Sequence, residues 1–288
     1  MTHPRIVFLD VDGTLIDHRQ HLAPSAVAAV REARAAGHLV YLATGRSRAE
    51  IPAAVAAVGF DGVVSAGGGF IERGEELLAA RTMPDASVVG IVEFFQRHGI
   101  EYTLQAYESA YPSPGLLARL APLFAESDDR RERGERLADT MAYRGPAPMT
   151  GIAKATFFGT DPGTFATVRD GLGDHFHVIT GTIPYLGEAG GEVSLVGMNK
   201  GTAITWLVEV LGLDIADSIA IGDSVNDLEM LEVAGLGIAM GDAPAHVISR
   251  ADDVTTSCEE DGVWNALVRH GLIDHGSSIP VLGPAARS

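Results

Sequence analysis

Acidic side chains stand directly after apolar, strand-like runs at two distant places in the sequence. Asp10 and Asp12 follow the run 5–9 (RIVFL), and Asp223 follows the run 218–221 (SIAI). In open α/β sheets, ligands bind in the crevice outside the carboxyl ends of the strands, so these acids are expected to meet at one edge. Carboxylates that close repel one another unless a metal ion or a cationic group lies between them. The spacing therefore predicts a cation site.

The same spacing suggests a different role for each acid. Asp10 and Asp12 are two residues apart on an extended segment, so their side chains point the same way. A metal held by Asp10 and Asp223 would keep Asp10 ionised as a nucleophile, while Asp12 could cycle a proton as general acid and base. An all-oxygen, carboxylate-rich site suits Mg²⁺, which completes its shell with water and substrate phosphate.

The elements that must position these acids alternate along the first and last parts of the chain. Strand patterns lie at 5–9, 38–43, 62–65, 218–221 and 236–240, and helical patterns at 24–36, about 47–58, 202–211, 227–234 and 261–270. Strands that alternate with helices in this way are typical of a doubly wound parallel sheet. We expect an α/β fold with a Rossmann-like core.

The middle of the chain has a different character. Its expected strands, at 153–158 and 175–180, are rich in β-branched and aromatic residues, and the charged tract 126–136 is expected to be a solvated loop or an exposed helix end. We interpret this region as an inserted α+β cap domain. The expected division is core 1–82, cap 83–185, core 186–275, and a Gly-, Ser- and Pro-rich tail 276–288 that is expected to be disordered.

The composition restricts the possible partners. The 288 residues have a formal net charge of −17, and so acidic a surface repels nucleic acid and anionic membranes, which are bound mainly through cationic side chains. No apolar run approaches the length of a membrane-spanning helix. The single cysteine, Cys258, excludes an intramolecular disulfide and lacks a paired histidine, so we expect it to be inert. A cytoplasmic monomer or homodimer without nucleic-acid or membrane partners is expected.

Four short motifs together resemble those of a known family. The segment 10–15 (DVDGTL) is similar to the first motif of the haloacid dehalogenase superfamily of phosphohydrolases, and Thr44, Lys200 and the segment 222–227 (GDSVND) are similar to its second, third and fourth. The long gap between Thr44 and Lys200 resembles the Cof-like subgroup, in which an α/β cap is inserted between motifs two and three. Two further stretches, 190–201 (GGEVSLVGMNKG) and 251–263 (ADDVTTSCEEDGV), support that subgroup.

This resemblance implies a magnesium-dependent phosphatase that forms an aspartyl-phosphate and acts on a small phosphorylated metabolite, such as a sugar phosphate. It implies that Asp10 is the nucleophile and that Asp12 is the acid and base, with its backbone carbonyl on the metal. The implied phosphate-binding residues are Thr44, Gly45, Lys200 and Asn226, and the implied metal ligands are Asp10, Asp12, Asp223 and Asp227. Phosphoryl transfer needs positive charge on the transferring oxygens, which Lys200 and the metal can supply.

The residues that would contact the rest of the substrate are less clearly marked. The subgroup commonly has an Asn-Gly pair after the third strand, whereas this chain has Gly67 in the Asn position. A cap that closes over the leaving group chooses the substrate. Candidates for such contacts are Arg46, Tyr107, Tyr111, Arg144 and Lys154. His175 and His177 alternate on an expected strand, but without an evident third ligand they fit a structural role better than a metal site.

Two other functions use the same residues. A phosphomutase would return the phosphoryl group to its substrate, and the large insertion argues against it because mutases of this superfamily resemble smaller-capped subgroups. A catalytically silent binding or regulatory module is the alternative from another class. The loss of Asp10, Asp12, Lys200 or Asp223 would have favoured such a module, and all four are present.

Overall fold

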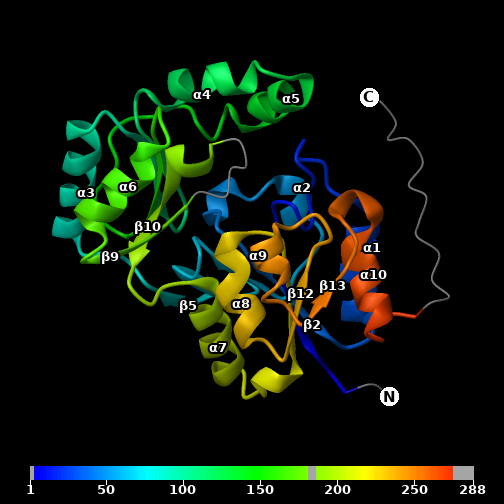
Figure 1. Cartoon of the computed structure of the whole chain (residues 1–288). Helices are drawn as coiled ribbons and strands as arrows, with labels where there is room; N and C mark the ends of the chain where they lie inside the picture. The colour runs from blue at the N-terminus through cyan, green and yellow to red at the C-terminus, as the bar shows by residue number, and fades with distance from the viewer. Residues whose placement is uncertain (1–2, 181–185, 275–288) are drawn as a thin grey trace.

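The computed structural model describes residues 3–180 and 186–274, which form two sheet-based units (Figure 1). The larger unit, the core, has an eight-stranded sheet with the order β13-β12-β11-β1-β2-β3-β4-β5. Strands β13 to β3 pair in parallel, and β4 and β5 form an antiparallel edge. The strands are β1 (Ile6–Leu9), β2 (Leu39–Ala43), β3 (Gly62–Ser65), β4 (Phe70–Arg73), β5 (Glu76–Ala80), β11 (Ser218–Gly222), β12 (Leu236–Ala239) and β13 (Asp253–Val254).

Helices cover both faces of this sheet. They are needed because successive apolar side chains of β1 point to opposite faces, and both sets are buried. Val7 and Leu9 lie in one apolar cluster with residues of α1 and α10, and Ile6 and Phe8 lie in another with residues of α7 and α8. A parallel strand that is buried on both faces has an unbroken apolar sequence, and the unbroken apolar run within 5–9 predicted β1 for this reason. The helices are α1 (Pro24–Ala35), α7 (Lys200–Val210), α8 (Leu228–Val233), α9 (Ala245–Ile248) and α10 (Gly262–Arg269) (Figure 1). The predicted doubly wound α/β core is confirmed.

The helix expected over 47–58 is wrong as a continuous element. The chain forms a 3₁₀ turn, η1 (Arg48–Glu50), and then a short helix, α2 (Ala53–Ala56). Pro52 disfavours the helical conformation of the residue before it, and Ile51 is extended with ψ of 122°. Ser47 begins the 3₁₀ turn with a capping box in which Ser47 N donates to Glu50 Oε2 at 2.9 Å.

The smaller unit, the cap, has a five-stranded antiparallel sheet with the order β7-β6-β8-β10-β9. Its strands are β6 (Glu101–Ala106), β7 (Ala110–Pro112), β8 (Ile152–Phe158), β9 (Phe176–Thr180) and β10 (Gly190–Leu195), and its helices are α3 (Asp85–Arg97), α4 (Leu116–Phe124), α5 (Asp128–Leu137) and α6 (Gly163–Leu172). The strands expected at 153–158 and 175–180 correspond to β8 and β9. The charged tract at 126–136 mostly forms α5.

The two faces of the cap sheet differ sharply in polarity. On one face, Leu104, Ala155, Phe157 and Val193 pack into an apolar cluster with residues of α3 and α6. The opposite face is polar, and strand register aligns its side chains in rows. One row is Thr103, Thr156 and Glu192, and the next is Gln105, Lys154 and Ser194. We call this face the polar face of the cap.

The boundaries of the units follow from the sheets. The boundary expected at 185/186 cuts the cap sheet, because β10 comes after it in the chain and pairs with both β8 and β9. The boundary expected at 82/83 falls between β5 and α3. Residues 181–185 and the tail 276–288 lie outside the described residues, so the expected disorder of the tail stays a prediction. Among the described residues, no helix has the length and apolar character needed to cross a membrane.

Candidate active site

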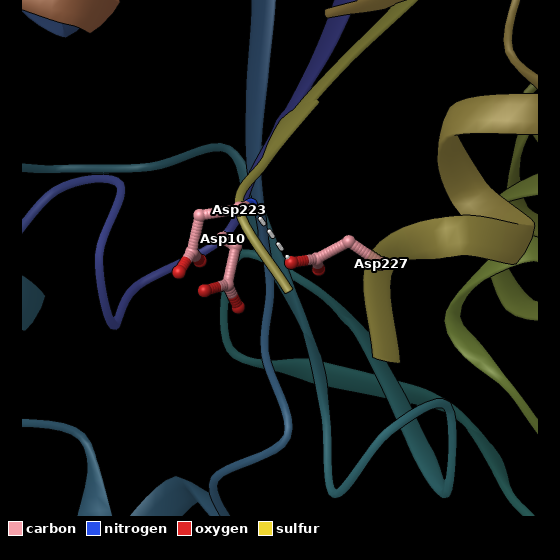
Figure 2. A group of neighbouring side chains, drawn as sticks. All are labelled: Asp10, Asp223 and Asp227. Carbon is pink, nitrogen blue, oxygen red and sulfur yellow. Dashed lines mark hydrogen bonds between the residues drawn. The ribbon is translucent and has the colours of Figure 1, made fainter. Parts of the chain in front are cut away.

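The carboxyl ends of β1 and β11 bring the predicted acids together. The two strands are neighbours in the sheet, and Asp10 N donates to Ile221 O at 3.0 Å just beyond the end of β1. Asp10, Asp223 and Asp227 each offer a carboxylate oxygen within 4.8 Å of the other two (Figure 2). Gly222 makes this possible, since a Cβ there would lie 2.5 Å from Asp227 Cγ. The predicted convergence is therefore present for Asp10 and Asp223, and Asp227 completes the group in place of Asp12.

Lys200 neutralises part of this acidic group. It is the first residue of α7, whose N-cap Asn199 accepts a hydrogen bond from Thr202 N at 2.7 Å. The side chain is 1% exposed, and Nζ donates to Asp10 Oδ1 at 2.5 Å and to Asp227 Oδ1 at 2.6 Å. A buried ammonium is tolerated only when it is paired and hydrogen-bonded. Lys200 is therefore held beside the predicted nucleophile by two carboxylates.

Asp227 also organises the loop that carries Asp223. Its Oδ2 accepts a hydrogen bond from the backbone amide of Asp223 at 3.1 Å (Figure 2). The same oxygen accepts a second hydrogen bond from the backbone amide of Ser224 at 3.0 Å. Because Oδ1 binds Lys200, both oxygens of Asp227 already have partners in the protein. Asp223 differs, since its Oδ1 is buried without a partner among the described residues. Asp227 is thus part of the acidic group, but it is committed mainly to positioning.

The site stabilises positive charge. Burial raises the pKa of Asp10 to about 7, with the charges of Asp227 and Asp12 adding to the effect and Lys200 opposing it. Burial and the neighbouring Asp227 and Asp10 likewise raise the pKa of Asp223 well above its usual range. A divalent cation would favour the ionised forms of both acids. The buried, unpaired Oδ1 of Asp223 and an all-oxygen donor set fit Mg²⁺.

Asp12 is held apart from this group by its own partners. Arg46 forms a bidentate ion pair with it, with Nε 2.6 Å from Oδ2 and Nη2 2.7 Å from Oδ1. Gln20 Nε2 donates to Asp12 Oδ1 at 3.1 Å, and Arg46 Nη1 donates to Glu50 O at 2.8 Å. A bidentate guanidinium fixes the direction of a carboxylate as well as binding it. Asp12 is therefore oriented at the edge of the site.

The predicted phosphate-binding residues also lie at this edge. Thr44 follows β2 and is 1% exposed, and its Oγ1 accepts a hydrogen bond from Arg46 N at 3.1 Å. Gly45 lies in a narrow space, because a Cβ there would be 2.9 Å from Asn226 Nδ2 and 3.3 Å from Lys154 Nζ. A side chain at position 45 would displace one of those groups. The predicted residues of the core, from Thr44 to Asn226, are thus brought together.

A cavity of about 130 Å³ lies between this edge and the cap. The core contributes its acids and the segment 44–46, and the cap contributes its polar face together with apolar side chains from α4, β8 and the segment before β8. The lining residues are Asp10, Asp12, Thr44, Gly45, Arg46, Glu50, Asp223, Ser224 and Asn226 from the core, and Thr103, Gln105, Leu116, Thr140, Met141, Lys154, Thr156, Phe158 and Glu192 from the cap.

Of the five predicted substrate-contacting residues, Arg46 and Lys154 line this cavity. Tyr107 lies elsewhere, because its hydroxyl donates to Glu72 Oε1 at 2.5 Å and its ring packs on Phe70. Arg144 pairs with Asp139 at 2.7 Å and lines a separate hollow. Tyr111 packs against the apolar cluster on the far face of the cap sheet. The predicted substrate contacts of Tyr107, Tyr111 and Arg144 are not seen, because each side chain has another partner or place in the fold.

Sequence reasoning missed most of the polar residues that the cap and η1 bring to the cavity. They are Glu50, Thr103, Gln105, Thr140, Thr156 and Glu192. One signal was available, since polar residues alternate with apolar ones in the strand-like run 152–158 (IAKATFF). A second signal is composition: Lys154 and Lys200 are the only lysines in the chain. Both are buried at this site, with exposed fractions of 2% and 1%.

The remaining predictions concern single residues. Gly67 has φ of +65°, and a Cβ there would meet Lys154 Cδ at 3.8 Å, so the stem of Lys154 lies beside the position where the subgroup has Asn. Cys258 is buried, and burial raises the pKa of its thiol to about 12, which agrees with an inert role. Among the described residues, the one acidic or histidine group spaced to hold a metal is Asp10, Asp223 and Asp227, so His175 and His177 form no such group.

Comparisons with known proteins agree along most of the chain. Residues 7–267 match the family model described as haloacid dehalogenase-like hydrolase. The putative phosphatase YkrA of Bacillus subtilis is 26% identical over 279 residues, covering 93% of this chain and 98% of that protein. The pyridoxal phosphate phosphatase YbhA of Escherichia coli is 26% identical over 282 residues, covering 92% of this chain and 98% of that protein.

Solved structures give the same result for the fold. A hypothetical protein from Geobacillus kaustophilus superposes with a TM-score of 0.76 at 26% identity, covering 94% of this chain and all of that one. A haloacid dehalogenase-like hydrolase from Bacillus subtilis superposes with a TM-score of 0.78 at 23% identity, covering 92% of this chain and 99% of that one. The family resemblance of the four motifs is confirmed.

Proposed function

The chain belongs to the haloacid dehalogenase-like hydrolases, and on this basis we propose that it is a magnesium-dependent phosphatase that forms an aspartyl-phosphate on Asp10. Its relatives include proteins named as phosphatases, and the chain is accordingly a phosphoric monoester hydrolase. The substrate we propose is a small phosphorylated metabolite, because the cavity between core and cap measures only about 130 Å³.

One observation carries the proposal. Asp10 is buried at the floor of a cavity, bonded to Lys200 and within reach of Asp223, while Asp12 lines the same cavity from two residues further along. A nucleophile, a separate acid and base, and fixed positive charge are what phosphoryl transfer requires. The presence of all of them in one cavity supports an enzyme over a silent binding module.

In the first step, a carboxylate oxygen of Asp10 attacks the phosphorus of the substrate in line with the ester bond. The P–O bond to the leaving group breaks, and the leaving oxygen takes a proton from Asp12. The hydrogen bond from Lys200 to Asp10 Oδ1 fixes the direction of the nucleophile. Lys200 also places positive charge beside the transferring group, where negative charge is concentrated in the transition state.

In the second step, a water molecule attacks the phosphorus of the aspartyl-phosphate. Asp12, now ionised, takes a proton from that water, the bond between phosphorus and the Asp10 oxygen breaks, and inorganic phosphate leaves. The bidentate pair with Arg46 favours the ionised form of Asp12 and orients it for this second step. Asp10 is regenerated, so the cycle balances without any other reactant.

We propose that Asp10 and Asp223 hold magnesium through their side chains, with the Asp12 carbonyl as a further ligand and Asp227 nearby. When bound, magnesium supplies positive charge to the phosphoryl oxygens and keeps neighbouring carboxylates ionised. The unpaired, buried Oδ1 of Asp223 supports this assignment. Thr44, Gly45 and Asn226 lie where they would contact the transferring phosphoryl group from the protein side.

The test uses p-nitrophenyl phosphate as a general phosphate ester. The wild-type protein should hydrolyse it with magnesium and stop when EDTA is added. Asp10→Asn should lower kcat by more than about a thousandfold, as expected for loss of a covalent nucleophile. Asp174→Asn, on the exposed loop before β9, is the matched control and should retain full activity. Retained turnover in Asp10→Asn, with no phosphoryl adduct in wild-type protein by intact mass spectrometry, would exclude the covalent route.

A further inference from the structure

We propose that Gln105 selects the substrate by accepting a hydrogen bond from a hydroxyl of the leaving group, and that the cavity favours monophosphates of uncharged polyols over those with a second anionic group. This inference rests on the proposed phosphatase function and specifies its substrate class. Gln105 lies on β6, on the polar face of the cap, and lines the cavity.

The orientation of the Gln105 amide is determined by its neighbour in the core. Its Nε2 lies 2.6 Å from Glu50 Oε2, and Glu50 Oε2 also accepts hydrogen bonds from Ser47 N, at 2.9 Å, and from Ser47 Oγ, at 2.8 Å. An ionised carboxylate only accepts hydrogen bonds, so the NH₂ group of the amide must face it. The carbonyl oxygen Oε1 is therefore directed away from Glu50.

This carbonyl oxygen lacks a partner in the protein. Gln105 is 4% exposed. Its Oε1 is buried and has no hydrogen-bond partner among the described residues. A buried acceptor without a donor is unfavourable, and sites that contain one discriminate strongly for ligands that supply the donor. A substrate hydroxyl would supply it, whereas a carboxylate or a second phosphate would bring another acceptor.

The charges around the cavity point to the same substrates. Its two cationic side chains are already paired: Arg46 with Asp12 and Glu50 O, and Lys154 with Glu192 Oε2 at 3.0 Å and Gly45 O at 2.5 Å. Glu50 of the core and Glu192 of the cap also line the cavity as acids. A second anion on the leaving group would meet these carboxylates, and like charges in a partly buried site repel strongly.

The rest of the cap lining suits a carbon skeleton that carries hydroxyls. Thr103 and Thr156 are paired in register on adjacent strands, and both line the cavity on the same face of the cap sheet as Gln105. Each threonine hydroxyl can donate and accept, which matches the hydroxyls of a polyol. Leu116, Met141 and Phe158 add an apolar wall. Polyol and sugar monophosphates present both kinds of surface.

The experiment compares substrates that differ only in one terminal group. The pairs are glycerol 3-phosphate with 3-phosphoglycerate, and sorbitol 6-phosphate with 6-phosphogluconate, in each of which CH₂OH is replaced by carboxylate. In the wild-type protein, kcat/KM should favour the polyol member of at least one pair by about tenfold or more, the scale of one hydrogen bond gained and one repulsion avoided. p-Nitrophenyl phosphate, which has no hydroxyl, serves as the reference substrate.

Variants assign the preference to Gln105. Gln105→Leu should lower kcat/KM for the polyol phosphates by about tenfold and reduce the preference within each pair. The loss should be smaller for p-nitrophenyl phosphate, which has no hydroxyl to donate to Gln105. Gln96→Leu, at an exposed position of α3, is the matched control. Should Gln105→Leu fail to fold, Thr103→Val, which keeps the shape of the side chain, tests the same face and should show the same loss on a smaller scale.

The outcomes separate this inference from the proposed function. If the wild-type protein does not hydrolyse p-nitrophenyl phosphate, the phosphatase assignment is wrong. Suppose that it hydrolyses that ester but turns over the acid member of each pair as fast as the polyol member. The inference is then wrong and the function stands, and the same holds if it hydrolyses neither polyol phosphate. An equal loss on every substrate in Gln105→Leu would mean that Gln105 only supports the structure, and would also overturn the proposal.

Discussion

The core and the cap each contribute one buried lysine to the active site, and the two lysines are held in different ways. Lys200 bonds two carboxylates, Asp10 and Asp227, and all three belong to the core. Lys154 bonds one carboxylate, Glu192 of the cap, and one backbone carbonyl, that of Gly45 in the core. The core lysine is thus part of a closed acidic group, whereas the cap lysine bridges the two units.

This difference separates chemistry from selection. Asp10, Asp223 and Thr44 come from loops that directly follow parallel strands, and Lys200, at the start of α7, reaches the same edge of the core sheet. The cap residues come from the middle of antiparallel strands, and they reach the reaction site only across the cavity. Changes in the core should therefore alter catalysis for every substrate, and changes in the cap should alter stability or substrate preference.

The largest expected difference between the units is in catalysis by the two lysines. Lys200→Met should lower kcat for p-nitrophenyl phosphate by about 10²–10³, as found when one group that stabilises transition-state charge is removed. Lys154→Met should leave that kcat within about threefold, because its partners are Glu192 and Gly45 rather than Asp10. Steady-state kinetics at saturating magnesium measure both. Equal losses in the two variants would remove the distinction between the units.

The second effect is on stability, and it should be seen in the cap. Lys154→Met leaves Glu192, which is 7% exposed, without its cationic partner. We expect the free energy of unfolding to fall by roughly 1.5–3 kcal/mol, the scale of a hydrogen bond to a charged group. The double variant Lys154→Met/Glu192→Gln should recover part of that loss, since no uncompensated carboxylate remains. Urea denaturation followed by circular dichroism would measure the cycle, and strictly additive effects would contradict a direct interaction.

The third effect concerns metal binding in the core. Asp223→Asn should raise the magnesium concentration that gives half-maximal activity. Loss of a residue that only supports a metal ligand typically weakens metal binding by roughly 10–100-fold, and loss of a ligand should weaken it at least as much. The reason is that, in the acidic group of the site, Asp223 Oδ1 is buried and has no partner among the described residues. A magnesium-dependent shift in the melting temperature gives a second readout that needs no turnover. A wild-type magnesium response in this variant would place the metal elsewhere.

The smallest effect is expected at Cys258, which belongs to the apolar cluster under α10. Because burial raises the pKa of its thiol to about 12, the thiol stays protonated at pH 8 and only a minute fraction is the reactive thiolate. A thiol reagent at pH 8 should react slowly with the folded protein and rapidly in urea. Cys258→Ala should retain wild-type activity. Rapid labelling of the native protein would show that this part of the core opens.

The sequence predicted the core well because its signals are local. An apolar run followed by an acid marks both the strand and the residue at its carboxyl end, as at Asp10 and Asp223. The broken helix at 47–58 was also marked locally, by Pro52, but its helical periodicity outweighed that signal. Even there, the alanine-rich composition gave no indication that the Glu50 side chain would bond the start of a 3₁₀ turn and also reach the cap domain.

The cap site could not be predicted in the same way, because strand pairing creates it. Thr103 and Thr156 are 53 positions apart in the sequence and become neighbours only through the β6–β8 register. Tyr107 and Arg144 were chosen because their side chains suit polar ligands, yet Glu72 and Asp139 bind them instead. A single sequence does not specify such partners, since many acids could serve equally well. The family motifs therefore located the chemistry and left the selectivity open.

The burial of both lysines has a practical consequence for chemical labelling. Lys154 and Lys200 are the only side chains with a primary amine, because every other Lys or Arg position in the chain is an arginine. An acylating reagent that reacts with primary amines therefore finds no side-chain target on the folded surface. Lys154 becomes a target only when its contact with Gly45 is broken, which requires the cap to separate from the core. The rate at which such a reagent marks Lys154, read by peptide mass spectrometry, would therefore measure how often the two units come apart.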